Sequence, residues 1–429
     1  LQFLTTVTLI VGLQKLGKAI TQSSWVTRIA ILINFFLLFN KGLGDVELYS
    51  DAVQGSSISV ALIAFALYYF FTNKFIRASV LMSIASIIHP VEGLTVFMVM
   101  TATLFYFAFI NQATSKKIFF QYVLIYAFTA GIFITALLFQ KFDGTAIPNH
   151  ELFFRIYHEF RHAHHYVFFY FPLIDKILFV FFISVLLLGS FGANSKLFVF
   201  TVISLFGTLI YIFFTDLMHL PLIADLQFYK VSQWIKLFAI LILVKALLKT
   251  RLGNVLASMK HSIAVLIIPA MLIVSVVLII IKPNFIDRPG IYHQYGSNWK
   301  TKNDMVDISI KISKQINKDA VFIQPFDCTE LKYFGRVSSW VDWKAFVKDQ
   351  SKIEEWYRRI QLVYGININD REKGFQLSAK ANEHFDNLTA KEIEECKQAG
   401  VTHILISKKY SPVEGKLILQ NNTYAVYQL

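Results

Sequence analysis

Residues 92–110, EGLTVFMVMTATLFYFAFI, form an apolar run with a single charge at its first position. A run of this length and composition is long enough to cross the hydrocarbon core of a bilayer as a helix. Further apolar runs lie on both sides of it. We therefore expect ten spans in all, at about 1–13, 25–40, 57–73, 76–90, 92–110, 118–140, 173–192, 197–215, 235–249 and 262–281.

The composition divides the chain near residue 283. Residues 1–283 carry 20 Lys and Arg against 10 Asp and Glu, whereas residues 284–429 carry 21 against 18. We expect an all-α polytopic membrane domain of about ten transmembrane helices over 1–283. A small extracytoplasmic α/β domain should follow over 284–429. The first span begins at Leu1 without a Met or a signal-peptide pattern, so we expect that helix to be truncated.

Charge predicts the sidedness, because Lys and Arg collect on the cytoplasmic side of membrane proteins. With ten spans, one face receives twelve basic residues and no acid, and the other receives all ten acids of residues 1–283. Loops 41–56, 89–92, 141–172 and 216–234, together with 284–429, are therefore predicted to lie outside the cytoplasm. The same distribution explains the net charge of +13, and it argues against a nucleic-acid partner.

Local patterns predict elements in the C-terminal domain. The spacing of Met305, Ile308, Ile312 and Ile316 predicts a helix, and 320–324 a buried strand. Residues 336–343 alternate like a second strand, and a polar helix is expected over 344–360. Thr389-Ala-Lys-Glu392 is a capping box that opens a helix, followed by a strand at 402–407 and a hairpin from 416–420 and 423–429. Cys328 and Cys396 are compatible with a disulfide, two thiols or buried apolar side chains.

The densest chemical feature is the loop 150–166, HELFFRIYHEFRHAHHY, which holds five of the eleven histidines. Imidazoles bind metals and move protons near neutral pH, and the forked Arg161 guanidinium suits phosphate or carboxylate. The alternative without a binding or catalytic role is an interfacial segment whose His and Tyr side chains lie at the headgroup level.

One part of this loop, His158-Glu159-Phe-Arg-His162, matches the HExxH signature of zinc proteases. In that hypothesis His158 and His162 bind the metal and Glu159 is the general base. A third ligand and a second family motif are needed, and in so His-rich a segment the match can arise by accident. We therefore favour no metal site, while a divalent cation stays compatible with the sequence.

Five short motifs together resemble a group of bacterial multi-spanning proteins, which in turn resemble GT-C type glycosyltransferases. They are His-Pro-x-x-Gly at 89–93, Arg-x-x-His-His-Tyr at 161–166, Gln-x-x-Lys at 227–230, Val-Asp-Trp-Lys at 341–344 and Trp-Tyr-x-Arg at 356–359. The resemblance implies many membrane helices, a soluble domain outside the cytoplasm of a bacterial inner membrane, and transfer of a sugar from a polyprenyl-phosphate carrier. Membrane lipid and the polyprenyl-phosphate-linked sugar are then the expected partners.

Such a transfer needs a carboxylate base for the acceptor hydroxyl and cations for the departing phosphate. The resemblance implies a catalytic acid in the first outer loop, which this chain would lack if its first helix is truncated. Asp45, Glu47 and Asp51 are the acids of loop 41–56 that we consider for this role; a divalent-cation site or plain polar surface is the alternative. The candidates for substrate and phosphate binding are Arg161, His162, His164, His165, Tyr166, His219, Gln227 and Lys230.

Other functions stay open. A transporter or flippase should have charged side chains along a path through its spans, and apart from Lys245 the span cores contain almost none. A non-catalytic assembly protein of envelope polysaccharide synthesis is a further alternative. The sequence does not identify the donor sugar or the acceptor.

Overall fold

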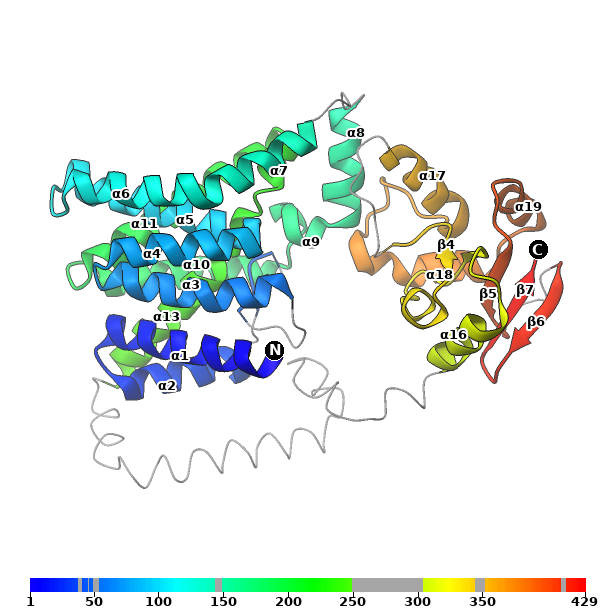
Figure 1. The fold of residues 1–429 in the computed structure, drawn as a ribbon, viewed down its shortest axis with the longest axis horizontal. Coiled ribbons are helices and arrows are strands. Elements are labelled where there is room, and N and C mark those ends of the chain that lie inside the picture. Colours follow the sequence, from blue (N-terminus) through cyan, green and yellow to red (C-terminus); the bar gives the residue numbers. More distant parts are fainter. Residues whose placement is uncertain are drawn as a thin grey trace, which may run out of the picture. The chain divides into compact units, whose positions relative to one another are not determined.

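The computed structural model describes residues 1–37, 41–44, 46–48, 54–142, 149–248, 304–343, 352–409 and 414–429 (Figure 1). The chain divides into two units. The first comprises Leu1–Gly144 and His164–His293, and the second comprises Thr145–Ala163 and Gln294–Leu429. The predicted domain boundary at residue 283 and the predicted span 262–281 lie outside the described residues.

The described residues of the first unit are helical apart from one short hairpin. Its first half contains α1 (Gln2–Thr21), α2 (Ser24–Leu32), η1 (Ile33–Leu37), β1 (Lys41–Gly42), β2 (Val46–Glu47), α3 (Gly55–Phe71), α4 (Phe75–Ile88), α5 (Pro90–Phe105), η2 (Tyr106–Ile110), α6 (Lys116–Tyr126), η3 (Ala127–Gly131) and α7 (Ile132–Phe142). The chain returns to it through α9 (Ala163–Tyr166), η5 (Phe168–Tyr170), α10 (Leu173–Ser190), α11 (Ser195–Ile212), η6 (Phe213–Leu217), α12 (Pro221–Ala224), η7 (Phe228–Val231) and α13 (Ser232–Leu247).

Five helical segments among the described residues are long and apolar enough to cross a membrane. They are Gln2–Thr21, Pro90–Ile110, Lys116–Leu137, Leu173–Ser190 and Ser195–Leu217. The segments Ser24–Phe35, Gly55–Phe71 and Phe75–Ile88 are apolar but shorter. The expected helical, apolar character of this region is therefore present, with fewer full-length spans in the described residues than the ten expected.

Helix α13 lies at the centre of the first unit. Its residues from Ser232 to Leu241 are all buried, and it contacts α1, α2 and α10. A helix that is covered on every side needs apolar residues all round rather than along one stripe. Figure 1 shows α1, α3 and α4 of the same unit side by side, in agreement with the contacts of α3 with both α1 and α4.

The second unit combines a five-stranded sheet with helices. Its elements are α8 (His150–Phe154), η4 (Arg155–Arg161), α16 (Asp304–Gln315), β3 (Val321–Ile323), η10 (Leu331–Gly335), β4 (Ser338–Ser339), α17 (Ile353–Tyr364), η12 (Gly374–Leu377), α18 (Ser378–Asp386), α19 (Ala390–Gln398), β5 (His403–Ser407), β6 (Lys416–Gln420) and β7 (Tyr424–Gln428). The strand order is β4-β3-β5-β7-β6. Strand β3 is parallel to β4 and β5, whereas β7 is antiparallel to β5 and β6.

Both faces of this sheet are covered, as the alternation along β5 shows. Leu405 packs in a cluster with Ile308 and Ile312 of α16. Its neighbours Ile404 and Ile406 belong to a separate cluster that includes residues of α17, α18 and α19. Successive side chains of a strand point to opposite faces, so one strand serves both cores.

The predicted elements of this domain are largely present. The helix with the Met305, Ile308 and Ile312 stripe is α16, and Thr389 caps α19 in a capping box. The predicted second strand over 336–343 is shorter, because only Ser338–Ser339 pairs as β4. Cys328 and Cys396 are both buried free thiols, which excludes the disulfide among the three alternatives.

Candidate functional site

The first turn of α5 places a carboxylate at the N-terminal end of an apolar helix. Pro90 occupies the first turn of the helix, and His89 caps it, because its Nδ1 accepts the Glu92 N–H at 3.3 Å. Burial lowers the pKa of His89, which favours the neutral ring that can accept this bond. A helix N-terminus favours a negative charge in its first turn, where Glu92 lies.

Glu92 is the buried centre of this candidate site. Its side chain is 1% exposed, lies 2.9 Å from Lys230 Nζ and accepts a hydrogen bond from Gln233 Nε2 at 3.0 Å. A buried carboxylate is stable only when it is paired and hydrogen-bonded, as it is here. Lys230 was predicted as a phosphate ligand; its partner Glu92 was not among the predicted site residues.

The segment before Lys230 bonds to the histidine-rich loop. Gln227 Nε2 donates to the Tyr166 hydroxyl at 2.8 Å, so two predicted binding residues are in direct contact. Gln227 holds its backbone at φ +46°, in the left-handed region that costs a non-glycine residue free energy. Such conformations persist where the surrounding structure enforces them, and they gather at functional sites. His219, also predicted, has φ +50° in the preceding loop.

The short hairpin β1–β2 also reaches this region of the first unit. His165 Nδ1 lies 3.1 Å from the Gly44 carbonyl oxygen, and the Ser232 hydroxyl donates to the Leu43 carbonyl at 3.1 Å. The three predicted catalytic acids belong to this hairpin or the residues after it. Asp45 and Asp51 lie outside the described residues, and only the backbone of Glu47 is described, in β2.

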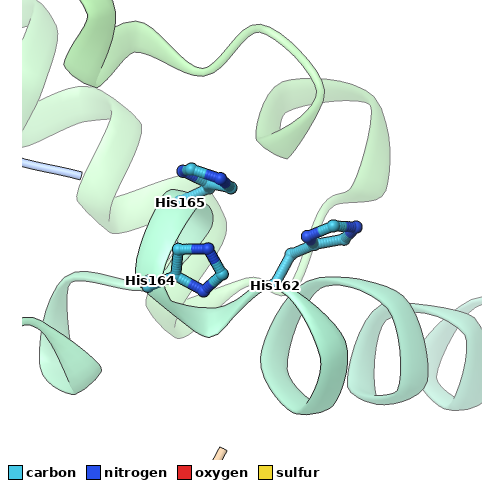
Figure 2. Close-up of side chains that lie close together, drawn as sticks. All are labelled: His162, His164 and His165. Atoms are coloured by element: carbon cyan, nitrogen blue, oxygen red, sulfur yellow. The ribbon is translucent and has the colours of Figure 1, made fainter. Parts of the chain in front are cut away.

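Three histidines form the group that suits a transition metal. Figure 2 shows His162 at the end of η4, with His164 and His165 on the short helix α9. One ring nitrogen of each lies within 4.8 Å of those of the other two. Zinc–nitrogen bonds of about 2.0–2.1 Å would need the rings closer. The chain passes from the second unit to the first between Ala163 and His164. The three histidines lie within four consecutive residues, so the local path of the chain is enough to bring them together.

The HExxH residues lie in and just after a π-helix. His158 and Glu159 belong to η4 and His162 follows it, whereas the protease signature lies on an α-helix. The His158 ring is fully buried and stacks on Phe154 with ring centroids 4.9 Å apart. Within the described part of the chain, the possible metal group is that of His162, His164 and His165.

Arg161 belongs to the second unit. It is 6% exposed, its Nε donates to the Trp343 carbonyl at 2.8 Å, and its guanidinium lies 6.0 Å from the centre of the Trp356 ring. It therefore serves the packing of η4 within that unit. The predicted residues that share the first unit are His164, His165, Tyr166, His219, Gln227 and Lys230.

Residues 303–363 match a family described as a domain of unknown function (DUF6798). The match covers a minor part of the chain and lies in the second unit, from α16 to α17. No curated protein matches the chain.

Proposed function

We propose that the protein is a membrane glycosyltransferase of the GT-C type, using a polyprenyl-phosphate-linked sugar at the outer face of the membrane in envelope glycan synthesis. The observation that carries this proposal is the bonding between the two predicted phosphate-side segments of the first unit. Tyr166 accepts from Gln227, and Lys230 follows Gln227 in η7, directly before α13. The apolar helices around them suit a polyprenyl chain.

Lys230 is the proposed phosphate ligand. An ammonium group has three donors, and the ion pair with Glu92 uses one of them. Glu92 is a positioning residue in this proposal, because it holds the Lys230 ammonium at the N-terminal end of α5. His164 and His165 supply further donors, with His165 oriented by the Gly44 carbonyl.

The reaction proceeds by displacement at the anomeric carbon. The bond from this carbon to the carrier phosphate breaks as the bond to the acceptor oxygen forms. The acceptor proton passes to a carboxylate, for which Asp45, Glu47 and Asp51 remain the candidates, and the phosphate leaves with the bonding electron pair. Cationic donors stabilise that departing charge, and removal of one such group typically slows a reaction by about 10²–10³.

The test combines binding and glycan synthesis. Polyprenyl phosphate should bind the purified protein in detergent at least tenfold more tightly than the neutral polyprenol. Lys230→Gln and Tyr166→Phe should weaken that binding and reduce labelled glycan in cells. Lys74→Gln, an exposed lysine at the opposite end of α4 from His89, is the matched control and should behave like wild type.

Two results would overturn the proposal. One is equal binding of polyprenol and polyprenyl phosphate. The other is wild-type glycan both in cells carrying Tyr166→Phe and in cells carrying Lys230→Gln, each variant shown to be folded by its thermal unfolding in detergent.

A further inference from the structure

The second unit contains a hollow of about 470 Å³ between the edge strand β4 and helix α17. Its lining comprises residues 337–342, Lys332 and Lys352, and the α17 residues Glu355, Trp356 and Arg359. All of these residues fall within the matched segment 303–363. A volume of this size suits a small ligand of one or two rings.

Two tryptophans form rigid apolar walls in this hollow. The Trp340 carbonyl accepts from Arg359 Nη1 at 3.0 Å, and the Arg359 guanidinium lies 4.9 Å from the centre of the Trp340 ring. Trp356 Nε1 donates to the Asp342 carbonyl at 3.1 Å. The guanidinium contact restrains the buried Trp340 ring and the Nε1 hydrogen bond restrains Trp356, so little conformational freedom remains to be lost when a ligand packs against them.

The charged side chains that line the hollow carry a net positive charge. It contains three cations, Lys332, Lys352 and Arg359, against the carboxylates Asp342 and Glu355. Glu355 is already bonded to Arg359 at 2.8 Å and to Arg358, outside the hollow, at 2.9 Å. Lys332 and Lys352 are both exposed to solvent at the rim.

Short hydroxyl side chains complete the lining. Ser338 is exposed, and the Ser339 hydroxyl donates to Gln324 Oε1 at 3.1 Å, which leaves its oxygen able to accept. Strand β4 is at the edge of the sheet but has only two residues, so a peptide strand added there would gain few backbone hydrogen bonds.

We propose that this hollow binds an acidic saccharide, a sugar unit that carries a carboxylate or phosphate. The half-buried Trp356 indole packs against the apolar face of the sugar ring. Lys332 and Lys352 bind the acidic group, and Ser338, Ser339 and Asp342 bond to the hydroxyls. The site lies wholly in the second unit, and it stands whether or not the chain transfers a sugar.

The test is calorimetric titration of the full-length protein in detergent with a glucuronic-acid-containing oligosaccharide. The same oligosaccharide with its carboxylates reduced to alcohols is the neutral probe. Saturable binding is expected, at least tenfold tighter for the acidic form. Lys332→Gln/Lys352→Gln should weaken it at least tenfold, and Lys314→Gln/Lys318→Gln, two exposed lysines of the same unit, should not.

The variant Trp356→Ala separates the contribution of stacking to binding from the contribution of charge. It should weaken binding of the acidic and the neutral oligosaccharide alike, with near-ultraviolet circular dichroism used to show that the domain remains folded. The proposal is overturned by absence of saturable binding, by equal affinity for the two oligosaccharides, or by equal loss with both lysine pairs, which would indicate a general surface-charge effect.

Discussion

Lys230 Nζ lies 2.9 Å from Glu92 Oε1, in an ion pair whose carboxylate is 1% exposed and whose ammonium side chain is 17% exposed. The pair joins the first turn of α5 to η7, the turn that leads into α13. Glu92 is the single charged residue of α5 and Lys230 that of η7, so each neutralises the other.

Glu92→Gln should therefore destabilise the first unit. The change leaves Lys230 opposite a neutral amide, and breaking a buried pair costs about 3–5 kcal/mol, with the partial exposure of Lys230 favouring the lower end. Thermal unfolding in detergent measures the loss. Glu92→Gln/Lys230→Met should recover part of it; a double variant less stable than Glu92→Gln would argue against the pair as the cause.

Gly93→Ala should also destabilise this unit, through packing between α4 and α5. A Cβ at residue 93 would lie 2.5 Å from Ser86 Cα and 2.6 Å from Ser86 N, which are backbone atoms that cannot rotate away. Overpacking of this kind costs about 1–3 kcal/mol. Gly131→Ala is the control, because its Cβ would meet only ordinary contacts of 3.4 Å and longer. Unfolding temperatures of the two variants in detergent compare them directly.

Both cysteines should react slowly in the native protein. Burial raises the pKa of the Cys328 and Cys396 thiols to about 12, against an ordinary 9.0, so the reactive thiolate is about a thousandfold scarcer. Mass spectrometry after brief iodoacetamide treatment should show unmodified thiols, and full alkylation once the domain is unfolded in denaturant. Rapid modification of the folded protein would contradict their burial.

Stability near α17 should depend on acidic pH through Glu355. Hydrogen bonds from Arg358 and Arg359 lower the pKa of Glu355 to about 2, from an ordinary 4.5. The contribution is therefore complete above pH 4.5 and decreases as the pH falls toward 2. Glu355 is 44% exposed, so the effect is at most about 1 kcal/mol. The difference in unfolding temperature between wild type and Glu355→Gln, measured from pH 6 to pH 3, should shrink over that window.

Thr389→Ala should cost about 1 kcal/mol, because the Thr389 hydroxyl accepts the Glu392 N–H while the Glu392 carboxylate accepts the Thr389 N–H. Lys391→Ala, an exposed change in the same helical turn, is the control. Denaturant titration followed by tryptophan fluorescence distinguishes them. Equal stability of the two variants would mean that the capping box contributes nothing.

Local signals predicted the second unit well. The apolar stripe of α16, the capping box at Thr389 and the hairpin of β6 and β7 each depend on residues close together in the sequence. In the first unit, the end of a helix was harder to predict from apolar runs. Helix α1 continues to Thr21, past the expected end at Leu13, because a lysine can stay helical while its ammonium packs on aromatic rings. Lys15 Nζ does so, 5.7 Å from the centre of the Phe65 ring.

The candidate site depended on long-range packing, which the sequence indicates only in part. Glu92, an acid in the first turn of an apolar span, was not predicted as a site residue. Its pairing with Lys230 and Gln233 follows from how α5 packs against η7 and the start of α13. Arg161 is three residues from His164, yet it bonds to Trp343 in the second unit. No local sequence pattern shows that Arg161 belongs to the second unit and His164 to the first.

The contact between Arg161 and Trp343 joins residues 182 positions apart. Phe160, beside it, packs its ring on those of Trp343 and Tyr357. During synthesis, η4 therefore emerges long before the strands and helices that cover it. Its apolar side chains stay uncovered until those later residues have been synthesised. A fragment that begins at residue 294 would expose the surface that η4 normally covers, and co-expression with residues 145–163 as a separate peptide should restore its solubility.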